Sequence, residues 1–299
     1  MIQLLTRSAL FVGLSVQVTM APAVVSAAPL ETKFVKSTDG VAIATQRWGK
    51  TDGAPIVFVH GWSQAGASWK LQVTGSLAAK YNLITLDLRG HGASGKPADL
   101  AAYTKPGVGG NDLRAVIKAY GLKRPVLVGW SYGTEIVREY LADHGDSNVR
   151  GIVLVGGPAS PKDFGKGLLS QVPGMLSPDM AVNVGATMQF LRNASAAPLS
   201  PDRFAEAVGI NMATAVVARL GVLKRTNPPA LAALSKLKVP ALIIHGKADR
   251  IILSSGAAGL AKVIPNATVK IYDNVGHMPF IEASKRFDAD IAAFVDGLK

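Results

Sequence analysis

The sequence predicts an α/β fold with a mostly parallel sheet, and three observations support this prediction. Short apolar runs alternate with helix-length stretches over most of the 299 residues, a pattern typical of parallel strands covered by helices on both faces. The first two runs are joined by a short turn instead, which predicts an antiparallel hairpin at the start of the sheet. A long stretch without a strand pattern separates Val155 from Ala241, which predicts an insertion.

The predicted strands are apolar runs bounded by turn-forming residues. The two hairpin strands, residues 33–36 and 41–46, flank the turn Ser37-Thr38-Asp39-Gly40. Six further runs have the length and composition of buried strands: 56–59, 83–86, 126–128, 152–155, 241–244 and 269–271. Right-handed crossovers are expected to join the parallel strands.

The insertion contains helix-like pieces at 179–191, 201–210 and 213–223, separated by glycine, proline and serine. We therefore predict a helical cap over the carboxyl edge of the sheet. The chain is long enough for one large core. The predicted organisation is a core of residues 28–157 and 230–299, a cap at 158–229 and a leader at 1–27.

The leader has the pattern of a secretory signal peptide. Arg7 precedes an apolar stretch from Ala9 to Val25, and small residues precede Pro29. We predict cleavage after Ala27, a secreted or periplasmic protein, and no stable membrane anchor after cleavage. A retained anchor is the alternative, disfavoured because polar residues and a proline interrupt the stretch: Gln17, Thr19 and Pro22.

Composition limits the classes of partner and cofactor. The chain has no cysteine, which excludes disulfides and thiolate metal sites. Its net charge of +12 comes from single basic residues and pairs rather than a basic tract, so we expect no nucleic-acid partner. No cluster of His, Asp and Glu has metal-ligand spacing, and we expect neither a metal nor a cofactor.

The candidate nucleophile is Ser131, in Gly129-Trp130-Ser131-Tyr132-Gly133. This G-x-S-x-G pattern follows an apolar strand and precedes an amphipathic helix, the context of a nucleophile elbow. A serine on so tight a bend is strained, and only residues without Cβ fit beside it. The pattern alone is weak, but an acid and a histidine follow in the order Ser, Asp, His.

A serine hydroxyl needs a base and a third group that orients the base. We favour His277, which lies in a loop after the last predicted strand. The other four histidines have structural interpretations. His60 and His245 should form hydrogen bonds in strand-end turns, His91 should shape its loop, and His144 should be solvated or cap a helix.

The favoured acid is Asp249, which follows the strand at 241–244. No carboxylate follows the strand that ends at Val155, where a triad acid could also lie. Asp273 is the runner-up, but its position four residues before His277 suits a turn better.

Acyl transfer also needs donors for the charge that develops on the substrate oxygen. The backbone N–H of Tyr132 is one candidate, at the start of the helix, and the N–H of Trp62 is the other. Trp62 and Trp130 are candidate substrate-binding residues, although packing beneath the serine turn is favoured for Trp130. The cap methionines would suit an apolar acyl chain if they faced the cleft: Met175, Met180, Met188 and Met212.

Five ordered motifs together resemble the α/β-hydrolase superfamily: His60-Gly61-Trp62, residues 87–94, residues 129–133, Gly246 to Asp249 and Gly276 to Pro279. The chain looks most similar to the branch of small serine esterases and cofactor-free haloperoxidases or perhydrolases. The resemblance implies an eight-stranded sheet with the cap after strand 6. It also implies a triad of Ser131, Asp249 and His277 and an oxyanion hole from the amides of Trp62 and Tyr132.

Serine at position 131 argues against the haloalkane dehalogenases and epoxide hydrolases of this fold, which use a carboxylate nucleophile. Thr134 and Leu253 depart from residues common in the family, without touching the chemistry. The expected function is hydrolysis of a small or medium apolar carboxylic ester, the small-molecule acyl partner, through an acyl-enzyme on Ser131. The alternatives are perhydrolysis or halide oxidation through a peracid, lactone or amide hydrolysis, and a ligand receptor with a vestigial triad.

Overall fold

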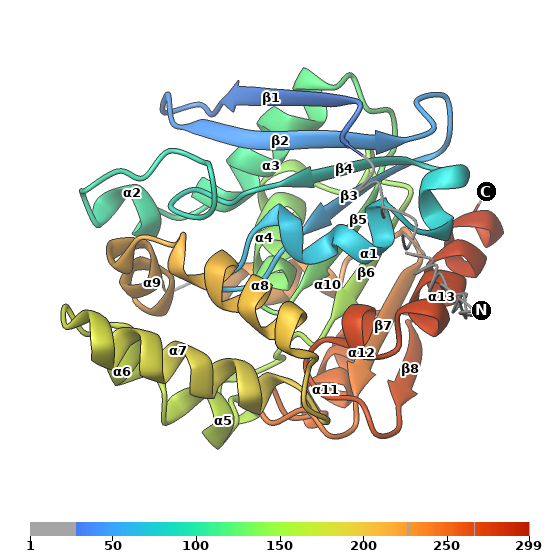
Figure 1. Cartoon of the computed structure of the whole chain (residues 1–299). Coiled ribbons are helices and arrows are strands. Elements are labelled where there is room, and N and C mark those ends of the chain that lie inside the picture. The colour runs from blue at the N-terminus through green and yellow to red at the C-terminus, as the bar shows by residue number, and fades with distance from the viewer. Residues whose placement is uncertain (1–27, 226–227, 266, 299) are drawn as a thin grey trace, which may run out of the picture.

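The computed structural model describes residues 28–225, 228–265 and 267–298, and side chains of 228–230 are left out of the description (Figure 1). The predicted leader, residues 1–27, lies outside the described residues. Within them, the elements follow the order that the sequence predicts, from an opening hairpin through alternating strands and helices to a carboxyl-terminal helix.

The eight strands form one sheet in the order β1-β2-β4-β3-β5-β6-β7-β8. β2 pairs antiparallel with both β1 and β4, and all other neighbours are parallel. The predicted mostly parallel sheet with an antiparallel start is confirmed. The strand bounds are β1 Glu31–Lys36, β2 Ala42–Gly49, β3 Pro55–Val59, β4 Asn82–Leu86, β5 Val126–Trp130, β6 Gly151–Val155, β7 Ala241–Gly246 and β8 Thr268–Tyr272.

Helices cover both faces of the sheet because alternate strand residues point to opposite sides. In β3, Phe58 packs in one buried cluster with Trp69 and Phe287, whereas Val57 packs in the other with Leu113 and Val137. The first cluster includes residues of α13 (Ser284–Gly297). The second lies against α3 (Val108–Ala119), α4 (Tyr132–His144) and α11 (Ser255–Val263).

The insertion between β6 and β7 is helical, as predicted. Its longer helices are α7 (Met180–Ala194), α8 (Pro201–Met212) and α9 (Val216–Leu223), which lie together as a layer apart from the sheet in Figure 1. α10 (Pro228–Leu234) instead contacts α4 and α11 of the core. The remaining short elements are η1 Gly66–Trp69, α1 Lys70–Val73, η2 Ser76–Ala79, α2 Ala101–Thr104, η3 Pro161–Asp163, α5 Lys166–Leu169, α6 Val172–Met175 and α12 Pro279–Glu282.

Within the described part of the chain, no single helix is long and apolar enough to cross a membrane. By length and composition alone, α8 and α9 pass such a test only when taken together, and the pair is bent by 81° at its break.

Candidate active site

Ser131 occupies the sharp turn between β5 and α4. Its φ of 53° and ψ of −119° lie where residues other than glycine are rarely found, so the turn is strained. A Cβ on Gly129 would lie 2.5 Å from the carbonyl oxygen of Gly133, and one on Gly133 would lie 2.3 Å from that of Val59. The prediction that only glycine fits on both sides of the serine is confirmed.

His277 and Asp249 meet although 28 positions separate them along the chain. His277 lies between β8 and α12, and its Nδ1 is 2.7 Å from Oδ2 of Asp249. Both side chains are buried. Because a carboxylate only accepts hydrogen bonds, Nδ1 carries the proton, and Nε2 is left with a lone pair that can accept one.

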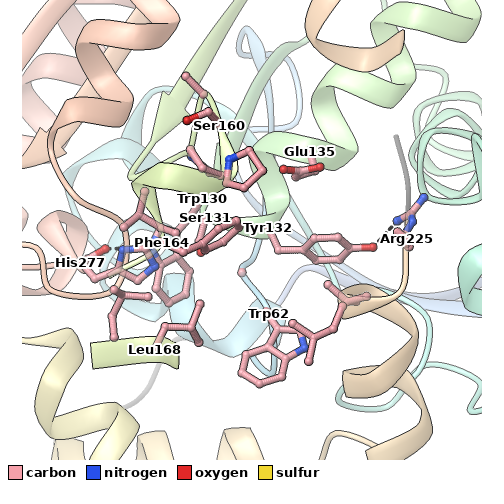
Figure 2. A pocket seen from close by; sticks show the side chains of 18 of the residues that line it. Trp62, Trp130, Ser131, Tyr132, Glu135, Ser160, Phe164, Leu168, Arg225 and His277 are labelled. Carbon is pink, nitrogen blue, oxygen red and sulfur yellow. Dashed lines mark hydrogen bonds between the residues drawn. The ribbon is translucent and has the colours of Figure 1, made fainter. Parts of the chain in front are cut away.

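Ser131 and His277 line the same cavity, which has a volume of about 640 Å³ (Figure 2). The ends of β5 and β6 hold them there. The N–H of Ser131 donates to the carbonyl of Val155 at 2.8 Å, and a Cβ on the next residue, Gly156, would lie 3.2 Å from Nδ1 of His277. Trp130 Nε1 also donates to the carbonyl of His277 at 2.8 Å. These contacts bring the three predicted triad residues to one region.

The Asp249 carboxylate is held in its ionised form by several donors. Oδ1 accepts the N–H groups of Ile251 at 2.8 Å and Ile252 at 3.0 Å, while Oδ2 faces His277. Burial by itself would raise the pKa of Asp249, but the neighbouring rings of His277 and His245 outweigh it, through the positive charge that each carries when protonated and through their hydrogen bonds, and lower the pKa to about 2. The carboxylate can therefore stabilise a positive charge on His277 at neutral pH.

The alternative acid, Asp273, has a different environment. Its side chain is exposed and pairs with Nζ of Lys247 at 2.9 Å. An exposed pair of this kind contributes little and orients nothing in the cavity. Of the two candidates, the structure therefore pairs Asp249, and not Asp273, with His277.

His245 touches the same carboxylate, which the sequence did not indicate. Its Nε2 lies 2.9 Å from the carbonyl of Ile252, the expected hydrogen bond beyond the strand end, and also 3.2 Å from Oδ2 of Asp249. Both neighbours are acceptors, so Nε2 carries the proton and adds a further donor beside the acid. The only local signal was the spacing of four residues between His245 and Asp249.

Glu282 is a second contributor that sequence reasoning missed. Its carboxylate accepts the N–H of Gly276 at 3.0 Å and that of Met278 at 3.1 Å, on either side of His277. The N–H of His277 itself donates to the carbonyl of Ala194 in α7 at 2.7 Å. The loop that carries the histidine is thus held by its own following helix and by the cap.

The two predicted oxyanion donors lie on opposite sides of the serine in sequence but close in space. A Cβ on Gly61 would lie 3.1 Å from Cβ of Ser131, so the loop after β3 passes directly beside the nucleophile. Among the described residues, neither the N–H of Trp62 nor that of Tyr132 donates to a protein acceptor. Both amides remain available to a substrate oxygen.

Two buried histidines shape this loop. His60 Nδ1 lies 2.8 Å from the carbonyl of Gly61, and its Nε2 accepts the N–H of Leu88. His91 Nδ1 lies 2.9 Å from the carbonyl of Arg89, and its Nε2 accepts the N–H of Ser63 at 3.2 Å. Each ring donates from Nδ1 and accepts at Nε2, so each must be neutral. The structural interpretation of both histidines agrees with these contacts.

The pair predicts a loss of stability in mild acid. Burial lowers the pKa of His60 to about 4, and burial together with the charge of His60 lowers that of His91 to about 3, from an ordinary value of 6.5. Between about pH 4 and pH 6.5, the two histidines bind protons in the unfolded chain but not in the folded chain. The free energy of unfolding should therefore fall by several kcal/mol as the pH drops from about 6.5 to 4.

Urea unfolding at a series of pH values measures this effect. His91→Gln keeps an acceptor for the N–H of Ser63 but cannot titrate. Its free energy of unfolding should therefore depend less steeply on pH than that of the wild type, and the difference in slope should correspond to one bound proton. Equal slopes for the two proteins would contradict the assignment.

The cavity beside Ser131 is walled mainly by apolar side chains of the core and cap. Trp62 lines it and packs edge-on against Phe190, with ring centroids 6.0 Å apart. Trp130 reaches its wall but is mostly core, because its ring packs edge-to-face against Trp69 and Phe280. Other apolar lining residues are Phe164, Leu168, Val222, Leu223, Leu231, Ile251 and Ile252. No cap methionine is among the lining residues described, so the suggested thioether surface is not found there.

One end of the cavity is polar. Figure 2 shows Tyr132 reaching from the nucleophile turn toward Arg225, which donates to its hydroxyl and to Glu139. Glu135 lines the same region and pairs with Arg138 at 2.6 Å. The substrate space therefore has an apolar body and a charged rim.

Comparison with known proteins agrees with this arrangement. Residues 54–284 match the family model described as alpha/beta hydrolase fold. The chain is 28% identical to a non-heme chloroperoxidase of Streptomyces lividans over 87% of this chain and 98% of that protein. It is 26% identical to a bifunctional esterase/perhydrolase of Acinetobacter calcoaceticus, over 88% and 99%. The crystal structure of an esterase from Rhodococcus superposes with a TM-score of 0.84 at 31% identity, covering 90% of this chain and 99% of that one.

Proposed function

We propose a function from one premise: the chain belongs to the family with the alpha/beta hydrolase fold. It is a hydrolase-fold enzyme with esterase and haloperoxidase relatives. The proposed reaction is hydrolysis of a small or medium apolar carboxylic ester through an acyl-enzyme on Ser131. The observation that carries this proposal is the contact of 2.7 Å between Nδ1 of His277, which lines the same cavity as Ser131, and the buried carboxylate of Asp249 behind it.

In the first half of the reaction, Oγ of Ser131 attacks the ester carbonyl while Nε2 of His277 takes the serine proton. The resulting imidazolium is stabilised by the ionised Asp249. The negative charge on the former carbonyl oxygen is accepted by the N–H groups of Trp62 and Tyr132, aided by the amino end of α4. Collapse of this intermediate expels the alcohol, which receives the proton from His277.

In the second half, water replaces the alcohol. His277 takes a proton from the water as it attacks the acyl carbon, and the same two amides hold the oxygen again. Collapse releases the carboxylic acid and returns the proton to Ser131. No step requires a group that the chain itself lacks.

The cavity supports the choice of substrate. Its volume of about 640 Å³ lies within the range of pockets that enclose small organic ligands. Its apolar walls favour an acyl chain or an alcohol of similar character, and burial of each methylene adds roughly 0.8 kcal/mol to binding. We therefore propose a small or medium apolar ester as the substrate.

A series of p-nitrophenyl esters from acetate to dodecanoate tests the function. We expect turnover from acetate to octanoate, with KM falling as the chain lengthens, and poor turnover of dodecanoate. The matched p-nitroanilides should react far more slowly, which separates ester from amide cleavage. A wild-type protein that binds such ligands but turns over none of them would support a receptor instead.

Perhydrolysis is the second candidate, favoured by the chloroperoxidase and esterase/perhydrolase relatives. Hydrogen peroxide would then attack the acyl-enzyme in place of water, releasing a peracid and free Ser131. The ratio of peracid to acid formed from one ester in the presence of peroxide distinguishes the two reactions.

We also propose that the enzyme is exported, with a small acyl compound as its partner. The support is the signal-like composition of residues 1–27, with Arg7 before an apolar stretch and small residues before Pro29. Amino-terminal sequencing of the mature protein tests cleavage after Ala27.

A further inference from the structure

We infer that Arg219, in cap helix α9, is a positioning residue for the oxyanion hole and acts through the ring of Trp62. The inference rests on the proposed function, because that function assigns the Trp62 amide to the oxyanion. It makes the cap a structural part of the catalytic machinery as well as a cover for the substrate.

Arg219 joins the helices of the cap. Its Nη1 donates to the carbonyl of Met175 and to Oδ1 of Asn183, both at 2.8 Å, and its Nη2 donates to the carbonyl of Asn211 at 2.7 Å. These partners belong to α6, α7 and α8. One side chain therefore ties α9 to the three preceding helices of the cap.

The guanidinium is unusual because it is buried without a counter-ion. Arg219 is 1% exposed, and no carboxylate among the described residues pairs with it. Burial lowers its pKa to about 10, so the group is still charged at neutral pH. A buried charge is tolerated only where oxygen acceptors surround it, so this cap interior is built around the arginine.

The same residue holds the oxyanion loop. The backbone carbonyl of Arg219 accepts the N–H of Trp62 Nε1 at 3.1 Å, and the Trp62 ring rests edge-on against Phe190 of α7. Ser63 Oγ lies 3.5 Å from the carbonyl of Asn211, which Arg219 also binds. Two consecutive residues of the loop thus contact the cap where the guanidinium fixes it.

The loop needs such support from outside. Ser63 has a φ of 60°, a conformation that residues other than glycine keep only when their surroundings enforce it. His91 holds the Ser63 amide from the core side, and the cap holds the side chains of Trp62 and Ser63 from the other. An oxyanion donor displaced by a fraction of an ångström loses much of its effect. A shift of α9 would carry the Trp62 ring, and with it the amide, out of place.

The test compares Arg219→Met, which removes all guanidinium donors, with Trp62→Phe, which removes the indole N–H and keeps an aromatic ring. On p-nitrophenyl acetate, a substrate with a minimal acyl chain, each variant should lower kcat by about tenfold or more, within the range for a disturbed oxyanion donor. KM should change less than about twofold, because ground-state binding of acetate does not depend on the donor. The exposed Lys224, at the end of the same helix, provides the control Lys224→Ala, which should match the wild type.

The kcat of the double variant, Arg219→Met with Trp62→Phe, supplies a second readout. If both variants act through one contact, the double variant should be little slower than the slower single variant, whereas independent effects would multiply. Arg219→Lys, which restores a charge and some donors, should recover part of the kcat.

Losses that multiply in the double variant would overturn the inference, and so would three other outcomes. One is a kcat for Arg219→Met equal to that of Lys224→Ala. Another is an effect confined to KM that grows with acyl length, which would mean that the cap only binds substrate. If Arg219→Met does not fold, an unchanged kcat in Trp62→Phe overturns it. A wild type without esterase activity would instead contradict the proposed function itself.

Discussion

Ser131→Ala is expected to lower kcat for ester hydrolysis by at least about 10⁴-fold, because no acyl-enzyme can form without the serine oxygen. The turn should survive, since alanine is smaller than serine and Gly129 and Gly133 still allow the close approach of the neighbouring backbone. Steady-state rates on p-nitrophenyl butyrate, with a thermal unfolding curve for each protein, measure the effect. Residual activity should reflect only binding and the two oxyanion amides.

The control for this change is Ser170→Ala, which alters an exposed serine in the cap and should leave kcat unchanged. A fluorophosphonate should label the wild type on the peptide that contains Ser131 and leave the Ser131→Ala protein unlabelled. Labelling at another residue, or near-normal turnover by Ser131→Ala, would place the nucleophile elsewhere.

Asp249→Asn is expected to lower kcat by about 10⁴-fold without unfolding the protein. Oδ1 of this residue accepts two backbone N–H groups, so the asparagine oxygen will take that position. Its NH₂ group must then face Nδ1 of His277. The imidazole will respond by moving its proton to Nε2, where it can no longer accept the proton of Ser131.

Asp273→Asn is the matched control, because it makes the same chemical change in the other acid near His277. Its side chain pairs with Lys247 at the surface, and kcat should stay within about twofold of the wild type, as for other exposed pairs. Equal losses in the two variants would mean that the assignment of the acid is wrong. A loss of kcat in Asp273→Asn alone would mean that Asp273, and not Asp249, is the triad acid.

All eight strands were predictable because their signals are local. The turn at residues 37–40 identified the two hairpin strands, and apolar runs between turn residues identified the other six, while the ends of the strands depended on pairing. β7 continues through His245 and Gly246, beyond the predicted end, since these residues pair with Ile271 and Tyr272 of β8. Helix α9 begins three residues later than predicted, where the N–H of Ala215 donates to Gly90 instead of continuing a helix.

The supporting contacts of the site could not be predicted. Glu282 reaches the amides beside His277, and the Trp62 ring reaches Arg219 from 157 positions away. The residues next to Glu282 and Arg219 in the sequence do not indicate that these side chains support the active site. Their partners are set by how the cap and the last helices pack on the core.

The sequence alone therefore determined the α/β architecture, the serine turn and the short set of candidate bases and acids. Backbone conformation and burial depend largely on residues that are close together in the sequence, so local patterns predict them. Only the folded chain decided that Asp249 rather than Asp273 faces His277, which ring nitrogen carries the proton, and that the cap supports the Trp62 loop. Hydrogen bonds form only when distant atoms come within about 3 Å of each other, and that precision comes from long-range packing.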